Sequence, residues 1–260
     1  MIKIFWSQVW LNAKVNQGGL NLAEFFAYRI CISLLMLILY CLIAYYAQGQ
    51  VDLTRWVVGN AFILCIFESI HSVGSCFNEE RSFGRLKTII VSPTSKLIVI
   101  MYRGVSSILI SFLTISIALF IGGKIFDVQF SEVNLGMLVV AMLISSFAAV
   151  GLGSLLAVFA LITDSMYLML NSVVMLIMIF SGANFPVTQL PDFAQWISKI
   201  FPLNRGIAAA NMSFSYDFNL EFWQLIREEA LLGLTFYLLA FFAIRIVERI
   251  AIRNASLEMF

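Results

Sequence analysis

The sequence predicts an all-α protein that crosses a membrane several times, and three observations lead to this fold class. Of its 260 residues, 61% are hydrophobic and 12% are charged, whereas a soluble domain is about half apolar and about a quarter charged. The mean hydropathy is +0.94. Several apolar runs reach the ~20 residues that a helix needs to cross a hydrocarbon core, and the alternating pattern of a membrane β-barrel is absent.

Six apolar runs predict six transmembrane helices, and we expect residues 1–260 to form a single transmembrane domain. No cleavable signal peptide is expected before the first run, because no small-residue cleavage pattern precedes it. The four cysteines are interpreted as packing residues. The predicted spans are Tyr28–Ala47, Val57–Phe77, Leu97–Ile121, Leu135–Ile162, Met166–Phe180 and Ala230–Val247.

The distribution of Lys and Arg predicts the orientation. With six spans, eleven of these residues fall on the side of the two termini and five on the other. Because cytoplasmic loops carry the excess of positive charge, both termini are expected in the cytoplasm. Residues 1–24 are expected to contribute an amphipathic interfacial helix on that side, since residues 2–13 place apolar and polar side chains on opposite faces. This helix either anchors the first span or acts as an elbow that shifts between states.

The second span contains Glu68 and His71, three residues apart and therefore on one helical face. Ionisable groups within a span usually face a bundle interior or a cavity. The two residues either form a hydrogen-bonded packing pair or contribute to transport. A metal site is not expected, because no further ligands cluster nearby. The candidate pathway residues are Glu68, His71, Asn171, Ser181 and Asn184.

Small residues recur every four positions in the fourth span. Such a stripe lets a neighbouring helix approach closely, so we expect it to serve helix packing. Its members are Ala141, Ser145, Ala149, Gly153 and Ala157.

Residues 181–205 predict an element that is neither a span nor a plain loop. A half-length apolar helix begins at Pro191 and stops at Pro202, which is typical of a re-entrant or interfacial hairpin, here on the outer side. Glu221, Glu228 and Glu229 follow it and are interpreted as solvated charges before the sixth span.

The connector after the second span, within residues 78–96, holds the densest charge cluster of the chain. Charge of this kind must lie outside the hydrocarbon. Phe83 and Leu86 have helical spacing and would give the connector an apolar docking face; the alternative is a solvated, positively charged loop. The candidate docking residues are Glu79, Glu80, Arg81, Phe83, Gly84, Arg85 and Leu86.

Motifs of soluble active sites are missing from the sequence. It contains no Gly-rich phosphate loop, no Ser/His/Asp arrangement and no zinc spacing. We therefore expect a protein that is not an enzyme, that binds no cofactor itself, and that has no nucleic-acid partner. Any ATP, with its Mg²⁺, is expected on another chain.

Two stretches resemble the type-two ATP-binding-cassette (ABC) exporter permeases. The connector 80–86, followed by 89–96 with its Ser92-Pro93, is similar to the cytoplasmic motif of that family. The stretch from Ser181-Gly182 through Pro186, Pro191 and Pro202 is similar to its hairpin between spans five and six. The Gly-Pro-Leu-Trp-like element of polysaccharide-exporting relatives is absent, so the sequence looks more like the branch that exports drugs, antibiotics, lipids or small peptides.

The resemblance implies a function and partners. The connector would form a coupling helix that docks on a separate ATPase subunit, and two permeases, either copies or sister chains, would work with two ATPase subunits in the bacterial inner membrane. The expected function is export of an apolar or amphipathic compound. Three alternatives stay open: export of a polysaccharide or glycolipid, a proton-coupled secondary transporter using Glu68 and His71, and a non-transporting scaffold or sensor.

Overall fold

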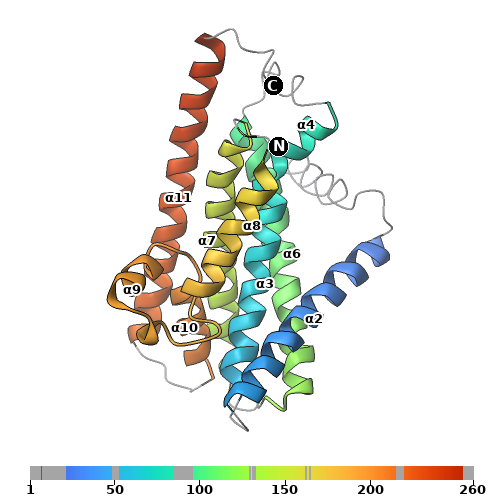
Figure 1. Ribbon diagram of the computed structural model, residues 1–260, viewed down its shortest axis with the longest axis vertical. Coiled ribbons are helices and arrows are strands. Elements are labelled where there is room, and N and C mark those ends of the chain that lie inside the picture. Colours follow the sequence, from blue (N-terminus) through green and yellow to red (C-terminus); the bar gives the residue numbers. More distant parts are fainter. Residues whose placement is uncertain are drawn as a thin grey trace.

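The structure is a bundle of long helices, shown in Figure 1. The computed structural model describes residues 7, 22–48, 53–84, 96–128, 130, 133–161, 163, 165–214 and 220–253, and these contain no β-strand. The fold is therefore all-α over the described residues, as predicted. The elements are α2 (Leu22–Gln48), α3 (Thr54–Gly74), α4 (Cys76–Ser82), α6 (Lys96–Ile125), α7 (Leu135–Phe159), α8 (Met166–Phe180), the short 3-10 helix η1 (Val187–Gln189), α9 (Asp192–Ser198), α10 (Asn204–Met212) and α11 (Leu220–Arg253).

Helix α3 is the centre of the bundle. Of the residues in its apolar window, 89% are buried, against 17% of those in the corresponding window of α2. It packs against α6, α7 and α8, while α11 packs along α7. Figure 1 shows α2 meeting the bundle near one end and diverging from it toward the other. The core is thus built around the second predicted span.

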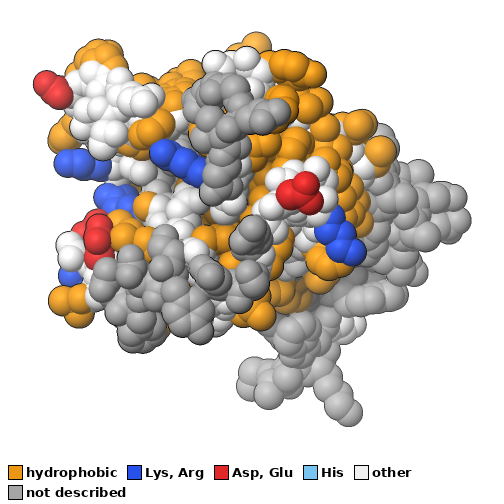
Figure 2. All heavy atoms as spheres, turned by 90° about the horizontal axis from the view of Figure 1, so that it is seen from below, with side chains coloured by type: hydrophobic (Ala, Val, Ile, Leu, Met, Phe, Trp, Pro, Cys, Tyr) orange, Lys and Arg blue, Asp and Glu red, His pale blue; other side chains and the backbone are white. Residues whose placement is uncertain are grey.

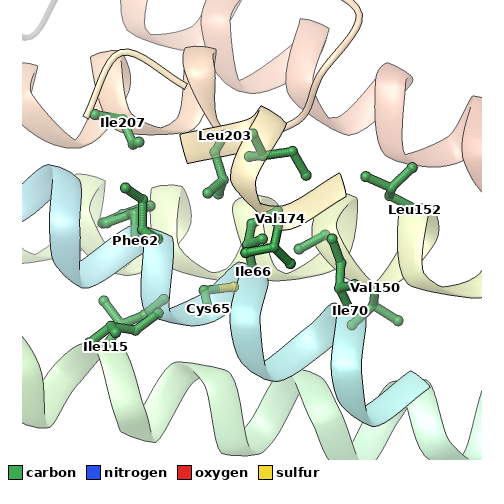
Figure 3. Close-up of a cluster of buried hydrophobic side chains, with 14 of the residues drawn as sticks. Phe62, Cys65, Ile66, Ile70, Ile115, Val150, Leu152, Val174, Leu203 and Ile207 are labelled. Carbon is green, nitrogen blue, oxygen red and sulfur yellow. The ribbon is translucent and has the colours of Figure 1, made fainter. Parts of the chain in front are cut away.

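The side chains of α3 fill the spaces between its neighbours, as Figure 3 shows. Phe62, Ile66 and Ile70 are fully buried. They point toward partners on the surrounding helices, including Ile115 of α6 and Val174 of α8. Because lipid tails are as apolar as these side chains, close packing and interhelical hydrogen bonds must hold such a core together.

Glycines bring α7 into close contact with helices on two sides. A Cβ added at Gly153 would lie 2.9 Å from the Ser69 carbonyl oxygen of α3. One added at Gly151 would lie 2.8 Å from the Gly233 carbonyl oxygen of α11. The stripe expected on this helix is buried at all five positions, which are Ala141, Ser145, Ala149, Gly153 and Ala157. Gly151 and Gly233 add a contact that the stripe did not include.

Five of the described helices are long and apolar enough to cross a membrane: α2, α3, α6, α7 and α11. The predicted fifth span has the bounds of α8, Met166–Phe180, but its 15 residues are fewer than a perpendicular span requires. The chain is therefore a multi-span membrane protein, and a sixth span stays a prediction. The predicted interfacial helix lies outside the described residues, apart from Ser7 and residues 22–24.

The two ends of the bundle differ. At one, called the connector end, lie α4, the start of α6, the α7–α8 turn and the end of α11. At the other, the hairpin end, lie η1, α9 and α10 with the start of α3. The large apolar side chains Phe193 and Trp196 of α9 point away from the protein, since they are 69% and 66% exposed. Whether this hairpin re-enters a membrane stays a prediction.

Candidate functional site

The connector begins as the short helix α4, which follows α3 after a break at Ser75. The helix ends at Ser82, and the next two amides bond back to it: Phe83 N donates to Glu79 O and Gly84 N to Arg81 O. Gly84 has a φ of 68°, the left-handed conformation that commonly ends a helix and that glycine adopts without strain. The end of α4 is thus encoded by Gly84.

A buried ion pair ties α4 to α6. Arg103 of α6 has a side chain only 3% exposed, and it donates to the Glu79 carboxylate at 2.5 Å. It also donates to the Ser72 carbonyl of α3 at 3.4 Å, while the other Glu79 oxygen accepts from the Ser75 hydroxyl. The guanidinium therefore joins α3, α4 and α6. We call Glu79 and Arg103 the connector clamp.

A second arginine ties α4 to the α7–α8 turn. The Arg81 guanidinium donates to the carbonyl oxygens of Leu161 and Thr163, both at 3.2 Å. These carbonyls follow the end of α7, where no further helical turn supplies amide donors to them. Arg81 therefore holds α4 to the turn between α7 and α8, and a movement of α4 would displace the start of α8.

Two of the candidate docking residues, Glu79 and Arg81, bond within this chain. Docking of a partner on the connector stays a prediction. Phe83 is 67% exposed, whereas Glu80 is partly buried. Phe83 and Leu86 would share a helical face only if α4 continued beyond Ser82. The helix ends at Ser82. Arg85 and Leu86 themselves lie outside the described residues.

Beside the connector clamp, Cys76 is fully buried and has no disulfide partner. Burial raises the pKa of its thiol to about 12, although Arg103 opposes this rise. The thiol is therefore protonated at physiological pH and acts as a packing group, as expected for the cysteines. Among the residues described, no group of three or more His, Cys, Asp or Glu side chains could hold a metal ion.

Polar side chains line the seam between α3 and α8. Toward the connector end, the His71 ring bonds through Nε2 to Asn171 Oδ1 at 3.0 Å, and through Nδ1 to the Phe67 carbonyl at 3.1 Å. Both ring nitrogens thus have partners other than Glu68, which is 9% exposed on the same helix. Because Asn171 is exposed in this single chain, the pair lies at the open side of the seam.

Toward the hairpin end, the same seam is closed by Asn184. Its side-chain oxygen accepts from Asn60 at 3.2 Å, and its carbonyl oxygen accepts from the Trp56 indole at 3.0 Å. Ser181, at the end of α8, is buried. The structure therefore distributes four of the five candidate pathway residues along one seam, with Glu68 on α3 beside it.

Glu229 is the polar residue that the sequence interpretation misplaced. It was expected to be solvated, but α11 begins at Leu220 and buries Glu229 completely. Its Oε1 accepts from the Leu203 amide at 2.7 Å, while Oε2 has no hydrogen-bond partner among the described residues. Leu203 has a φ of 79°, a strained conformation that persists only where the surroundings enforce it.

Glu229 thereby fixes the start of α10 against α7 and α11. Gly206, in the first turn of α10, fits against Ser145 of α7 so closely that a Cβ there would overlap the hydroxyl. Arg205 of the same turn pairs with Glu228 at 2.9 Å on the exposed side. Residues 228 and 229 are both glutamates, so the sequence does not show which of them is buried. Only the contacts around Leu203 and Gly206 in the structure distinguish Glu229 from Glu228.

Together the fold and these contacts define a membrane protein whose polar connector is bonded into the bundle at one end and whose hairpin is bonded in at the other. The family model described as ABC-2 family transporter protein matches residues 44–245. The chain therefore belongs to the ABC-2 transporter family, which confirms the resemblance seen in the sequence. ABC-2 permeases normally work with an ATPase subunit. A search of curated proteins found no match.

Proposed function

We propose that this chain is the membrane subunit of an ATP-driven exporter that moves an apolar or amphipathic compound out of the cytoplasm. ATP and Mg²⁺ bind to a separate nucleotide-binding subunit, and this chain binds no cofactor. The connector end faces the cytoplasm of a bacterial inner membrane, together with both termini. The excess of Lys and Arg on that side supports this orientation.

The observation that carries the proposal is the bonding of α4 into three neighbouring segments. A helix that only terminates a span needs no buried ion pair, yet Arg103 joins it to α3 and α6, and Arg81 joins it to the α7–α8 turn. A force that a partner subunit applies to α4 is therefore transmitted directly to the bundle. Phe83, exposed beside it, is the apolar side chain on which an ATPase subunit would act.

The seam between α3 and α8 is the proposed pathway wall. A hydrogen-bonded His71–Asn171 pair exposed at membrane depth is costly against lipid, so this side is proposed to face a second permease copy or a sister chain. The exposed residues around the pair are mainly apolar, including Leu168 at 71% and Met175 at 56%. A wall of this composition suits an amphipathic compound.

The test is the stimulation of an ATPase subunit by the reconstituted permease. Phe83→Ala is expected to reduce stimulation several-fold, because it removes the exposed apolar anchor. The matched control is Phe193→Ala, which removes a phenylalanine that is 69% exposed at the opposite end. Equal stimulation by the two variants would contradict docking at Phe83.

Transport measured in the same vesicles tests the energy source. Export that requires ATP and the ATPase subunit supports the proposal. Export that proceeds without them, and that stops when Glu68 is changed to Gln, would favour the proton-coupled alternative.

A further inference from the structure

The hairpin end contains a cavity of about 380 Å³ that the proposed coupling mechanism does not use. It lies between the start of α3, the end of α8 with η1, and α10. Its volume falls within the range of small-molecule sites. Its polar and charged lining residues are Arg55, Ser181, Thr188, Asn204 and Asn211.

Arg55 is the one cationic residue that lines this cavity, and no acidic residue lines it within the described part of the chain. Its guanidinium donates to the Gly182 carbonyl at 3.5 Å, the limit of a hydrogen bond. By contrast, Arg205 pairs with Glu228 at 2.9 Å and also donates twice to the Lys199 carbonyl. A guanidinium has five N–H donors, so Arg55 retains donors for a ligand whereas those of Arg205 are largely used.

The remaining walls of the cavity suit a ligand that is polar at one end only. The amide nitrogens of Asn204 and Asn211 already donate to Ser198 Oγ and to the Ile207 carbonyl. Their oxygens are therefore left to accept from a hydroxyl group. Val187, Ile207 and Ala208 supply apolar lining. Figure 2 looks onto this end and shows several Lys and Arg side chains close together on one side of it.

We propose that this cavity binds the acidic head group of an amphipathic compound, with Arg55 as its anion-binding residue. Phosphate and carboxylate match the planar donors of a guanidinium. The apolar wall then receives the start of the hydrocarbon tail. This inference deepens the proposed function, on which it rests for its biological role: at the outward-facing end, the cavity would hold an acidic amphipath next to the α3–α8 seam.

The probe is octyl phosphate, titrated into the full-length chain in nanodiscs of neutral phosphatidylcholine and followed by isothermal titration calorimetry. Octyl phosphate is expected to bind saturably, and Arg55→Gln to weaken binding about tenfold or more, the loss typical of a hydrogen bond to a charged group. Arg55→Lys is expected to restore part of the affinity. Lys124→Gln, which removes an exposed cation at the end of α6, is expected to leave binding within about twofold.

A second variant keeps the proposal testable should Arg55→Gln fail to fold. Ala208→Phe leaves the arginine in place but fills the cavity, and it is expected to weaken octyl phosphate binding as well. Circular dichroism and gel filtration check that each variant is folded. Equal binding of octyl phosphate and cationic octyltrimethylammonium, or no effect of either cavity variant, would overturn the proposal. If inorganic phosphate displaces octyl phosphate at the same concentration, the proposed contact of the hydrocarbon tail with the apolar wall is overturned.

The acidic head group has two sources, a membrane lipid or a transported compound. If octyl phosphate binds more weakly in phosphatidylglycerol nanodiscs than in phosphatidylcholine, an anionic lipid occupies the cavity; unchanged binding assigns it to a compound from solution. Because these titrations contain no ATPase subunit, a negative result bears on the cavity alone. ATPase stimulation through Phe83 fails or succeeds independently of it.

Discussion

The connector clamp allows a quantitative prediction. In Glu79→Gln, the side-chain oxygen that accepts from Ser75 can remain, but the charge that neutralises Arg103 is lost. Removing one partner of a buried ion pair costs about 3–5 kcal/mol, because the other charge stays buried and uncompensated. The Glu79 side chain is 28% exposed, so water screens part of the pair. We therefore expect a loss of about 2–3 kcal/mol in the free energy of unfolding.

Replacing Arg103 on α6 should lower stability less when Glu79 on α4 has already been replaced. Arg103→Met removes the buried charge and keeps the apolar stem, so the double variant Glu79→Gln, Arg103→Met should be close in stability to Arg103→Met alone. The resulting double-mutant cycle should give a coupling energy of about 2 kcal/mol. Unfolding in mixed dodecyl maltoside and SDS micelles, followed by far-UV circular dichroism, measures all four proteins.

The control for this cycle is Glu221→Gln, which neutralises an exposed carboxylate in the first turn of α11. Its effect should stay within about 0.5 kcal/mol, as is usual for surface substitutions. A Glu79→Gln variant no less stable than this control, or a coupling energy near zero, would refute the idea that the ion pair holds α4 to the bundle.

Three further contacts can be tested by substitution. Arg81→Gln should release the α7–α8 turn, measured as faster amide hydrogen exchange there, with no acceleration in α11. Glu229→Ala should lower stability by about 2–4 kcal/mol, because it leaves the buried Leu203 amide unpaired and opens a cavity; Glu229→Gln keeps an acceptor and should lose less, and equal losses would contradict this account. Gly153→Ala should cost about 1–3 kcal/mol by overpacking α7 against α3, whereas Gly136→Ala, exposed on the same helix, should be neutral or slightly stabilising in the same unfolding assay.

The positions of the long helices could be predicted because an apolar run of sufficient length has one stable conformation in lipid. The bounds of α8 followed directly, since no charged residue interrupts Met166–Phe180 and Ser181-Gly182 ends it. The start of α11 was placed at Ala230, ten residues late. Its first turns carry Glu228 and Glu229, which broke the apolar run although the helix continues through them.

The directions of the polar side chains could not be predicted, because their partners are distant in the sequence. Arg81 reaches carbonyl groups of the α7–α8 turn, and Glu229 reaches Leu203 across the hairpin. Helical spacing shows which residues share a face but does not show what that face meets. Helix α10 was missed for a related reason: Arg205 and Asn211 make its pattern polar, and its buried side depends on Ile207 and two alanines.

The glycine contact between α7 and α11 has a consequence for how the chain is made. Gly151 opens a notch in α7 into which the backbone of α11 fits at Gly233. Helix α11 is the last described helix, so during synthesis this notch stays uncovered while α8 and the whole hairpin are completed. A ribosome stalled before residue 220 would leave a bundle with an open groove and with Leu203 lacking its carboxylate partner, a product that membrane quality-control proteases could distinguish from the finished chain.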